Sequence, residues 1–498
     1  MESEEIIRIN TILSGEGSVY FVGIKGTGVC ALAELMHNNG FKVSGSDTSE
    51  VFYTDSILKE LNIPYHENFD SAHISTDIDI VIHSAAYSAD SNPELARAEE
   101  LNISVLKYTD ALGAWSARFD STGICGVHGK TTTTAICGVC MRAAGLPAQI
   151  LVGSAVPDFG GRSTIVLGDK YFIAETCEYR RHFLSFCPKR IILTSVESDH
   201  QDYFPDYASI RDAFIEYCRL LPDGGLLIYC ADDPGAVEVA KIIGKEKSGV
   251  ELIPYGFNAE GEFKILSYNV ENGRAVFSLA GIPEEFKLQI PGRHEALNAA
   301  AALALVKTLV KEEFGAVEEN VISGKKLLSV KTALEKFKST KRRSEIIGEA
   351  GGIVFMDDYG HHPTAIKTTL AGIKCFYPER RIVISFMSHT YTRTSALFKE
   401  FINSFSDADV LFLHRIYGSA RESYNGAVDG RLLYEKTAAL RKGETRYIDN
   451  PDDAFEPLCK VLKDGDLFMT LGAGNNWPLA GKLFAHFKSI ENQESSHD

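Results

Sequence analysis

The chain contains 498 residues, enough for about three domains at roughly 150 residues each. Hydrophobic residues make up 45% of the sequence and charged residues 24%, which excludes a largely disordered chain, a fibrous repeat and a small disulfide scaffold. The 67 Asp and Glu residues outnumber the 51 Lys and Arg residues and give a net charge of −16, so we expect no nucleic-acid partner.

The first residues, MESEEIIRIN, are acidic and carry no charged-then-apolar signal pattern. No run of about 18 apolar residues occurs, so we expect neither a membrane span nor a membrane partner. The ten cysteines are scattered, and the C-x-x-C of Cys137 and Cys140 has no second pair to complete a zinc site. The sequence therefore predicts a cytoplasmic protein with reduced thiols, and we expect a monomer or a weak homodimer.

From Ser18 onward, short apolar runs alternate with amphipathic stretches, a pattern typical of strand–helix units in parallel sheets. A helix is expected between Gly28 and Gly40. The first set of predicted strands comprises SVYFVGI (18–24), FKVSGSD (41–47), IDIVIHSA (78–85) and ISVL (103–106).

A second set begins with the strand STGICGV (121–127) and a helix from Lys130 to about Ala144. Extended segments between about 262 and 291 predict a small antiparallel addition, and an alanine-rich helix is expected over 294–309. The third set of predicted strands comprises GGIVFMDDYG (351–360), RIVISF (381–386), DVLFLH (409–414) and DLFMTLG (466–472).

These three sets predict an α/β protein with three domains in series. The first would be a Rossmann-like domain over 1–117, the second a central P-loop ATPase-like domain over 118–332, and the third a C-terminal Rossmann-like domain over 333–498.

The strongest motif is GVHGKTTTT, residues 126–134, which follows a predicted strand and opens a predicted helix. Successive backbone N–H groups from Gly126 to Lys130 are expected to face phosphate oxygens, and the helix dipole favours the same anion. Lys130 would supply a charge for the terminal phosphates, and the hydroxyl of Thr131 would reach Mg²⁺. The alternative is a glycine-rich turn with an exposed lysine.

A second glycine-rich turn, GIKGTG (23–28), also lies between a predicted strand and a helix, and Asp47 ends the next strand. The pattern is close to a dinucleotide fingerprint, but Lys25 occupies the position of the second glycine. It indicates a nucleotide diphosphate at a helix N-terminus more than NAD specifically, with a plain tight turn as the alternative.

Acidic and histidine side chains follow two strands of the central set. ETCE (175–178) ends one strand and ESDH (197–200) follows the next, at the edge where open α/β sheets place ligands. Carboxylate and hydroxyl oxygens suit Mg²⁺, so one carboxylate and one imidazole could complete a site with Thr131. The alternative is a solvated loop acid and a capping Asp-His pair.

A fourth motif, DDYGHHP (357–363), ends a strand of the third set. We do not expect His361 and His362 to bind one metal together, because neighbouring side chains diverge. Satisfied loop histidines are the alternative to a functional role.

In this order, these motifs resemble those of the Mur ligase family, over about residues 18–477. The similarity extends to further strings, which are HSAAYSADSNP (83–93), GRHEALN (292–298), KRR (341–343), YTRT (391–394), ARE (420–422) and LGAG (471–474). Within the family, the absence of lysine between Tyr203 and Leu221 favours the branch that adds L-alanine, because the branches that add later residues usually carry a carbamylated lysine there.

The resemblance implies an ATP-dependent, amide-forming enzyme that joins L-alanine to UDP-N-acetylmuramate in peptidoglycan synthesis, with Mg²⁺ as a cofactor. The first domain would hold the UDP-sugar, the second ATP and the third the amino acid. The residues implied for ATP are Gly126, Val127, His128, Gly129, Lys130, Thr131, Thr132, His294, Asn298 and Arg342. Those implied for the UDP-sugar are Gly23, Gly26, Gly28, Asp47 and Ser84.

For Mg²⁺ the resemblance implies Thr131, Glu175 and His200, and for the amino acid His361 and Arg393. The implied catalytic set is Lys130, Glu175, His200, His361 and Arg393. The sequence departs from the family pattern at Lys25, Cys177, Ser344 and Thr390, the last of which replaces an arginine.

Three other functions remain open from the sequence. A recycling ligase would join a preformed tripeptide to the same UDP-sugar. An NAD-dependent oxidoreductase would leave the motif at 126–134 unexplained. A regulatory nucleotide-binding protein is a third possibility, although the retention of Lys130, Thr131 and Glu175 argues against it.

Overall fold

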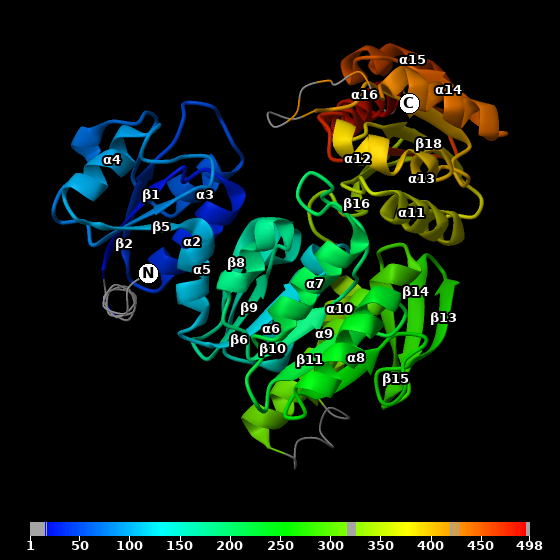
Figure 1. Ribbon diagram of the computed structural model, residues 1–498. Coiled ribbons are helices and arrows are strands. Elements are labelled where there is room, and N and C mark those ends of the chain that lie inside the picture. Colours follow the sequence, from blue (N-terminus) through cyan, green and yellow to red (C-terminus); the bar gives the residue numbers. More distant parts are fainter. Residues whose placement is uncertain are drawn as a thin grey trace. The chain divides into compact units, whose positions relative to one another are not determined.

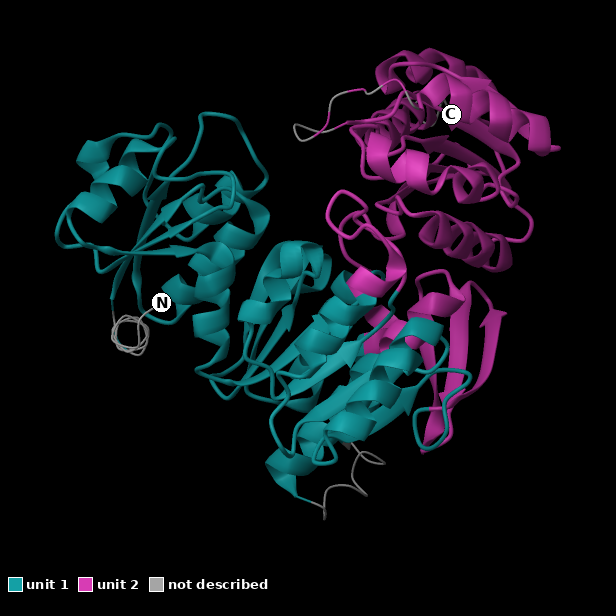
Figure 2. Cartoon of the chain, viewed as in Figure 1, with its two compact units in different colours: residues 1–196, 211–263, 301–333 teal, residues 197–210, 264–300, 334–498 magenta. Residues whose placement is uncertain are grey.

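The computed structural model describes residue 15, residues 17–315, 325–418, 422, 424 and 426, and residues 428–494. The chain forms two compact units (Figure 2). The first comprises 1–196, 211–263 and 301–333, and the second 197–210, 264–300 and 334–498. Many of the elements are labelled in Figure 1.

The N-terminal sheet has five parallel strands in the order β3-β2-β1-β4-β5. Its central strand, β1, is buried at four of its five residues, as expected for a parallel sheet covered on both faces. The strands are β1 (Ser18–Val22), β2 (Lys42–Ser46), β3 (Tyr65–His66), β4 (Ile80–His83) and β5 (Ser104–Lys107). The helices of this part are α2 (Thr27–Asn38), α3 (Thr54–Glu60), α4 (Pro93–Glu100) and α5 (Tyr108–Ser116).

The central sheet has seven strands in the order β12-β11-β10-β6-β9-β7-β8, and β8 alone among them is antiparallel to its neighbour. Helix α6 begins after Gly129 and ends before Gly145, and both glycines have left-handed backbone angles (φ 81° and 71°). The strands are β6 (Asp120–Cys125), β7 (Ala148–Val156), β8 (Arg162–Val166), β9 (Tyr171–Glu175), β10 (Arg190–Leu193), β11 (Leu226–Cys230) and β12 (Glu251–Tyr255). The helices are α6 (Lys130–Ala144), α7 (Tyr207–Cys218) and α8 (Pro234–Glu246).

A three-stranded antiparallel sheet and two helices follow the central sheet in the chain. The strands are β13 (Ile265–Glu271), β14 (Arg274–Leu279) and β15 (Ile282–Leu288), and the helices are α9 (Arg293–Phe314) and α10 (Lys325–Lys336).

The C-terminal sheet has six strands in the order β16-β17-β21-β18-β19-β20, parallel except for the β16–β17 pair. Its two faces carry separate hydrophobic clusters, one including Met356 and Leu411 and the other Phe355 and Phe412, so successive strand residues point to opposite faces. The strands are β16 (Glu345–Ala350), β17 (Ile353–Asp358), β18 (Arg381–Phe386), β19 (Val410–Leu413), β20 (Glu444–Tyr447) and β21 (Asp466–Leu471). The helices are α11 (Pro363–Phe376), α12 (Tyr391–Ala396), α13 (Phe398–Ile402), α14 (Gly430–Leu440), α15 (Phe455–Val461) and α16 (Pro478–Glu494).

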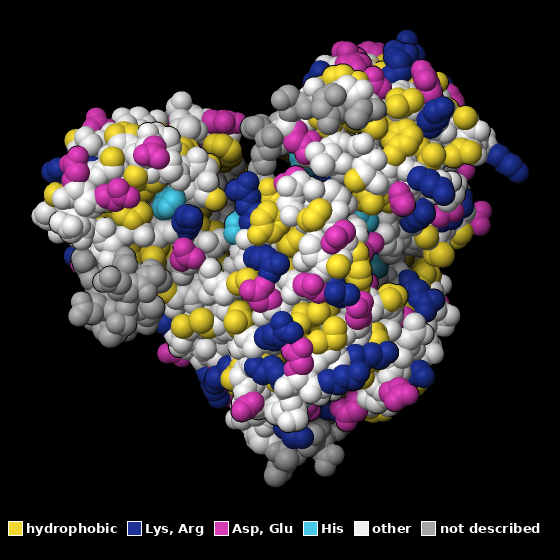
Figure 3. Space-filling model, in the orientation of Figure 1, with side chains coloured by type: hydrophobic (Ala, Val, Ile, Leu, Met, Phe, Trp, Pro, Cys, Tyr) yellow, Lys and Arg dark blue, Asp and Glu magenta, His cyan; other side chains and the backbone are white. Residues whose placement is uncertain are grey.

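The α/β class and the antiparallel addition predicted from the sequence are confirmed. The predicted helix from Lys130 to Ala144 has those bounds in the structure. In the described part of the chain, no helix is long and apolar enough to cross a membrane. Basic and acidic side chains are interspersed over the face seen in Figure 3. Ion pairs such as that of Arg219 with Glu246 join exposed charges of opposite sign.

Candidate active site

The loop that joins β6 to α6 is tethered to the segment that follows β10. Gly126 has a φ of 133°, and a Cβ there would lie 2.1 Å from the hydroxyl of Thr194, so only glycine fits. The N–H groups of Val127 and His128 donate to the backbone oxygen (3.0 Å) and hydroxyl (2.9 Å) of Ser195. The expectation that successive N–H groups of this turn face phosphate oxygens is therefore not met by Val127 and His128, whose N–H groups are bonded to Ser195.

The N-terminus of α6 presents the remaining donors. The N–H of Thr133 donates to the carbonyl oxygen of Gly129 at 2.9 Å, which is the first hydrogen bond of the helix. The N–H groups of Lys130, Thr131 and Thr132 precede it, in the first turn, where an α-helix offers no acceptor of its own. Such a turn suits an anion because both the N–H groups and the helix dipole attract negative charge.

Lys130 lies against a buried acid that was not among the predicted site residues. Its Nζ atom is 3.0 Å from Oε2 of Glu178 and also donates to the carbonyl oxygen of Gly126. Burial lowers the pKa of Lys130, but the negative groups around it, with Glu178 the strongest and Glu175 among them, together outweigh that effect, so the net shift is upward and the lysine stays protonated. From the sequence, Glu178 could have been recognised as a site residue because it is the second acid of the E-x-x-E string at the end of β9.

Thr131 and Glu175, predicted to act together, are in contact. The Thr131 hydroxyl donates to Oε1 of Glu175 at 3.1 Å, and the N–H of Gly153 on β7 donates to Oε2 at 2.9 Å. A Cβ on Gly153 would lie 2.4 Å from that oxygen, so the glycine leaves room for the carboxylate. A hydroxyl beside a carboxylate fits the oxygen ligands that Mg²⁺ prefers.

His200, the third predicted metal ligand, lies in the other compact unit, in the segment 197–210. Its φ is 54°, and its N–H donates to the carboxylate of Asp199 at 2.7 Å.

The turn at 23–28 is built at the carboxyl ends of β1 and β2. Gly23, with a φ of 82°, donates its N–H to Ser46 at 2.8 Å, and Gly26 donates back to Gly23 at 3.2 Å. Asp47 accepts from the N–H groups of Lys25 and Thr48, both at 2.7 Å. Its carboxylate therefore holds the turn in shape, a role that suits an acid better than direct contact with a diphosphate, which it would repel.

The other residues predicted at this turn adjoin it. The N–H of Ser84 donates to Val22 at 3.0 Å. Gly28 approaches the hydroxyl of Tyr108 so closely that a Cβ would lie 2.9 Å from it. The structure thus brings the predicted UDP-sugar residues Gly23, Gly26, Gly28, Asp47 and Ser84 to one edge of the N-terminal sheet.

His294 and Asn298 lie at the start of α9 around a second buried acid, Glu295. The Asn298 amide donates to Glu295 at 2.9 Å, and Nε2 of His294 is 3.3 Å from the same carboxylate. Burial lowers the pKa of His294, but Glu295 outweighs burial and the net shift is upward. Nδ1 of His294 is buried and has no hydrogen-bond partner among the described residues, which is the kind of polar atom that a bound ligand can satisfy.

Arg393 lies in α12 and is paired with Asp199. Nε of Arg393 donates to Asp199 at 2.7 Å, and a terminal nitrogen donates to the carbonyl oxygen of His389 at 2.7 Å. Its ionic partner is thus Asp199 and not an acid of the 357–363 motif, where Asp357 is paired with Arg342. Burial raises the pKa of Asp199, but the charge of Arg393 and the hydrogen bond that it donates act in the opposite direction, and the pKa lies well below its usual range.

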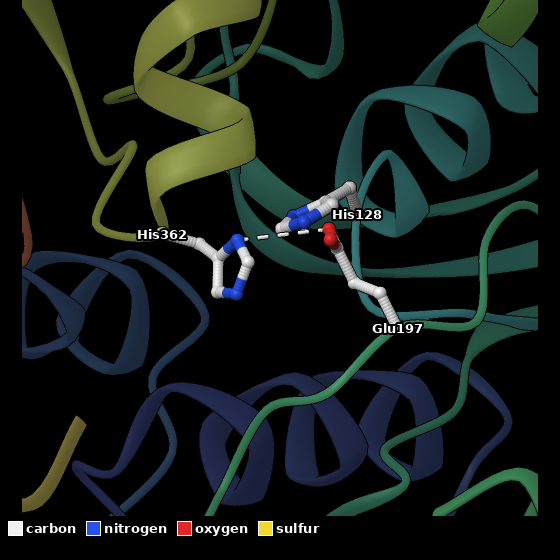
Figure 4. Close-up of side chains that lie close together, drawn as sticks. All are labelled: His128, Glu197 and His362. Atoms are coloured by element: carbon white, nitrogen blue, oxygen red, sulfur yellow. Dashed lines mark ion pairs between the residues drawn. The ribbon is translucent and has the colours of Figure 1, made fainter. Parts of the chain in front are cut away.

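His361 and His362 have different surroundings. Nδ1 of His361 lies 2.9 Å from the carbonyl oxygen of Tyr359, and burial, aided by the charge of Arg393, lowers its pKa well below the usual value. His362 caps α11 and faces Glu197, with Nδ1 and Oε1 3.6 Å apart (Figure 4). Because its pKa is lowered, His361 is neutral at physiological pH.

Arg342 lies in the segment before β16 and contacts the ends of two strands. It donates to Asp357 at 2.9 Å and to the carbonyl oxygen of Gly472 at 2.8 Å, and its guanidinium lies 5.0 Å from the ring of Tyr359. Burial outweighs the charge of Arg342 and raises the pKa of Asp357 to about 6.

Three family models match the chain in order. They are the Mur ligase family catalytic domain over 18–120, the Mur ligase middle domain over 124–306 and the Mur ligase glutamate ligase domain over 342–474. The chain therefore belongs to the Mur ligase family.

Among curated relatives, the UDP-N-acetylmuramate–L-alanine ligase of Treponema pallidum is 48% identical over 94% of this chain and 96% of its own length. The protein of the same name from Borreliella burgdorferi is 37% identical over 93% of this chain and 97% of its own. Among solved structures, a UDP-N-acetylmuramate–alanine ligase from Thermotoga maritima covers 95% of this chain and 99% of its own at 22% identity, with a TM-score of 0.74. A murein peptide ligase from Psychrobacter arcticus has the same coverage at 21% identity and a TM-score of 0.63. These structures share the fold.

Proposed function

We propose that this Mur ligase family member uses ATP to join L-alanine to the lactyl carboxylate of UDP-N-acetylmuramate, a step in making peptidoglycan precursors. The observation that carries this proposal is the 48% identity, over nearly the whole chain, to a relative named for that reaction. The arrangement of Lys130 and Thr131 at the start of α6 supports it because both groups suit the handling of a nucleotide triphosphate.

The reaction needs activation because a carboxylate is a poor electrophile. Transfer of the terminal phosphoryl group of ATP to the lactyl carboxylate would give an acyl phosphate, and the amine of alanine would then attack its carbonyl carbon and release phosphate. Phosphoryl transfer depends mainly on positioning and charge neutralisation, so no protein nucleophile is required.

Within this proposal, Lys130 neutralises charge on the transferred phosphoryl group, and Glu178 keeps the ammonium in place. Thr131 and Glu175, with His200, would hold Mg²⁺, which would neutralise phosphate charge when bound. The buried Nδ1 of His294, together with Asn298, provides polar atoms for the base or ribose of ATP.

The amino acid is assigned to the C-terminal domain, which we place at 333–498, after a UDP-sugar domain over 1–117 and an ATP domain over 118–332. The guanidinium of Arg393 has five donors, and its hydrogen bonds to Asp199 and His389 leave it a planar fork suited to a carboxylate. His361, whose Nδ1 is 2.9 Å from the carbonyl oxygen of Tyr359, would orient the amine of the amino acid.

A phosphate-release assay tests the proposal. The purified chain is incubated with ATP, Mg²⁺, UDP-N-acetylmuramate and, in separate reactions, L-alanine, glycine, L-serine or the tripeptide used by recycling ligases. We expect the highest kcat/KM with L-alanine and a product whose mass equals the sum of the two substrates less water. Preference for the tripeptide, or no phosphate release with any acceptor, contradicts the proposal.

A further inference from the structure

Lys25 departs from the glycine pattern of the 23–28 turn, yet its side chain does not project into solvent. The residue is 1% exposed. Its Nζ atom lies 3.0 Å from the carbonyl oxygen of Thr48, 3.1 Å from that of Glu50 and 3.0 Å from the carboxylate of Asp55. A second carboxylate, that of Glu67, is 3.1 Å away.

The main chain of Lys25 is bound to the same part of the molecule. Its N–H donates to Asp47 at 2.7 Å, and its carbonyl oxygen accepts from the hydroxyl of Thr54 at 2.6 Å. A lysine that holds both ends of the segment 47–55 by main chain and side chain fixes that segment against the turn.

The charges around Lys25 are matched to this role. Burial lowers the pKa of Lys25, but Asp55 and Glu67 outweigh burial and raise it. Burial raises the pKa of Asp55, but hydrogen bonds from Phe52, Tyr65 and Lys25 outweigh it and lower that pKa. Both groups are therefore charged at physiological pH, and removing one leaves the other poorly compensated.

The segment 47–55 follows β2, at the edge of the N-terminal sheet where the predicted UDP-sugar residues lie. Its tip, residues 51–53, is exposed and apolar. Val51 is 84% exposed, Tyr53 48% and Phe52 38%. Within this segment the N–H of Phe52 donates to Asp55 at 2.7 Å, and Lys25 binds the segment on both sides of the tip, at Thr48 and Glu50 before it and at Asp55 after it.

We propose that Lys25 is a positioning residue for the nucleotide part of the UDP-sugar, fixing the 23–28 turn and the segment 47–55 in one binding arrangement without itself touching the diphosphate. The inference rests on the proposed function. A glycine at this position would bring the backbone closer to a diphosphate, as in the dinucleotide fingerprint, but it would leave the segment 47–55 without its anchor.

The test compares Lys25→Met, which keeps most of the length of the side chain and removes its charge, with Lys25→Arg, Lys25→Gly and the control Lys42→Met. Lys42 is an exposed lysine on β2 of the same sheet. We expect Lys25→Met and Lys25→Gly to raise the KM for the UDP-sugar by roughly tenfold, less than the roughly 100-fold that a misplacement of about 1 Å can cost, because the N–H of residue 25 can still bond to Asp47. The kcat and the KM values for ATP and L-alanine should stay within about twofold. Lys25→Arg should recover most of the affinity, and Lys42→Met should match the parent.

Direct titration with UDP keeps the inference testable if a variant is less stable. It is carried out well below the melting temperature of each variant, on protein shown to be folded by circular dichroism. A purely structural lysine would lower the melting temperature or the active fraction and leave the KM and the Kd for UDP unchanged, which would overturn the inference. Inactivity of the parent enzyme with every acceptor would instead contradict the proposed function.

Discussion

Lys130 is the charged residue at the start of α6, and its protonated state is secured by Glu178. We expect Lys130→Ala to lower kcat by at least roughly 100-fold, because loss of one preorganised charge contact in a transition state costs about 2.7–4 kcal/mol. The Kd for the UDP-sugar should change little, since the glycine turn at 23–28 belongs to another sheet. Steady-state kinetics and UDP titration measure the two effects.

The matched control for Lys130 is Lys189→Ala, which removes an exposed lysine from the central domain. It should leave kcat unchanged. Retention of substantial activity by Lys130→Ala would contradict the assignment of the loop to ATP.

Arg393 is expected to bind the carboxylate of the amino acid through paired hydrogen bonds. Arg393→Lys should raise the KM for L-alanine strongly, by roughly tenfold or more, because an ammonium cannot reproduce the fork. The KM for ATP should stay near the parent value. The control is Arg446→Lys, which changes an exposed arginine paired with Glu444. Equal KM values for L-alanine in Arg393→Lys and the parent would exclude the clamp and leave Arg393 as the partner of Asp199 alone.

At the level of helices and strands, the sequence was most informative where a hydrophobic run ended in glycine. The bounds of α6 follow from Gly129 before it and Gly145 after it, because both residues have left-handed angles that lie outside the helical region and both are visible in the sequence as glycines. The apolar runs of the parallel sheets were equally clear because both faces of these strands are buried.

Side-chain partners were much less predictable. Nothing in the spacing indicates that Glu178 meets Lys130, or that Asp199 meets Arg393 from a position 194 residues away. The same holds for Lys25, whose partners Asp55 and Glu67 come from later elements. Residue types and strand ends could thus be predicted, whereas pairings that depend on tertiary folding could not.

The β18–β19 pair contains a buried histidine whose protonation should affect stability. His414, 1% exposed, follows β19, and its Nε2 lies 2.8 Å from the hydroxyl of Ser385 on β18. Its Nδ1 lies 2.7 Å from the carbonyl oxygen of Ile448. Burial lowers the pKa of His414 to about 4, so the folded chain keeps this histidine neutral.

The unfolded chain binds a proton at this histidine near the ordinary histidine pKa of 6.5, well before the folded chain does. The contribution of His414 to the free energy of unfolding is therefore fully present above about pH 6.5. It falls by up to ~3 kcal/mol as the pH drops toward 4. Denaturant unfolding of the C-terminal domain at several pH values should show a shallower pH dependence for His414→Gln. His361 gives the parent and His414→Gln the same pH dependence of the free energy of unfolding, so it does not affect their difference. The control is His66→Gln, which changes an exposed histidine. Parallel curves for His414→Gln and the parent would contradict the assignment.

At the scale of the whole molecule, the N-terminal and central sheets belong to one compact unit and are joined by specific polar contacts. The side chains of Asn39, after α2, and Gln149, on β7, exchange hydrogen bonds of 3.3 and 2.8 Å. Gly113 of α5 approaches the backbone of Ser185 so closely that a Cβ would lie 2.0 Å from its carbonyl oxygen. These contacts hold the N-terminal and central sheets together within the first unit, and we call the two joined sheets the platform.

Arg162, at the start of β8, forms ion pairs between the two sheets of this platform. It is 2.8 Å from Glu34 of α2 and 2.7 Å from Glu60 of α3, and the Glu34 side chain is only 2% exposed. Arg162→Met should lower the free energy of unfolding of the first unit by about 3–5 kcal/mol, because it leaves a buried carboxylate without its partner. The double variant Glu34→Met/Arg162→Met should recover much of that loss, whereas Glu60→Gln should cost less than about 1 kcal/mol because Glu60 is exposed. Denaturant titration followed by the fluorescence of Trp115, which is buried in α5 of this unit, measures the effect. Additive losses in the double variant would mean that Arg162 and Glu34 stabilise the platform independently of each other.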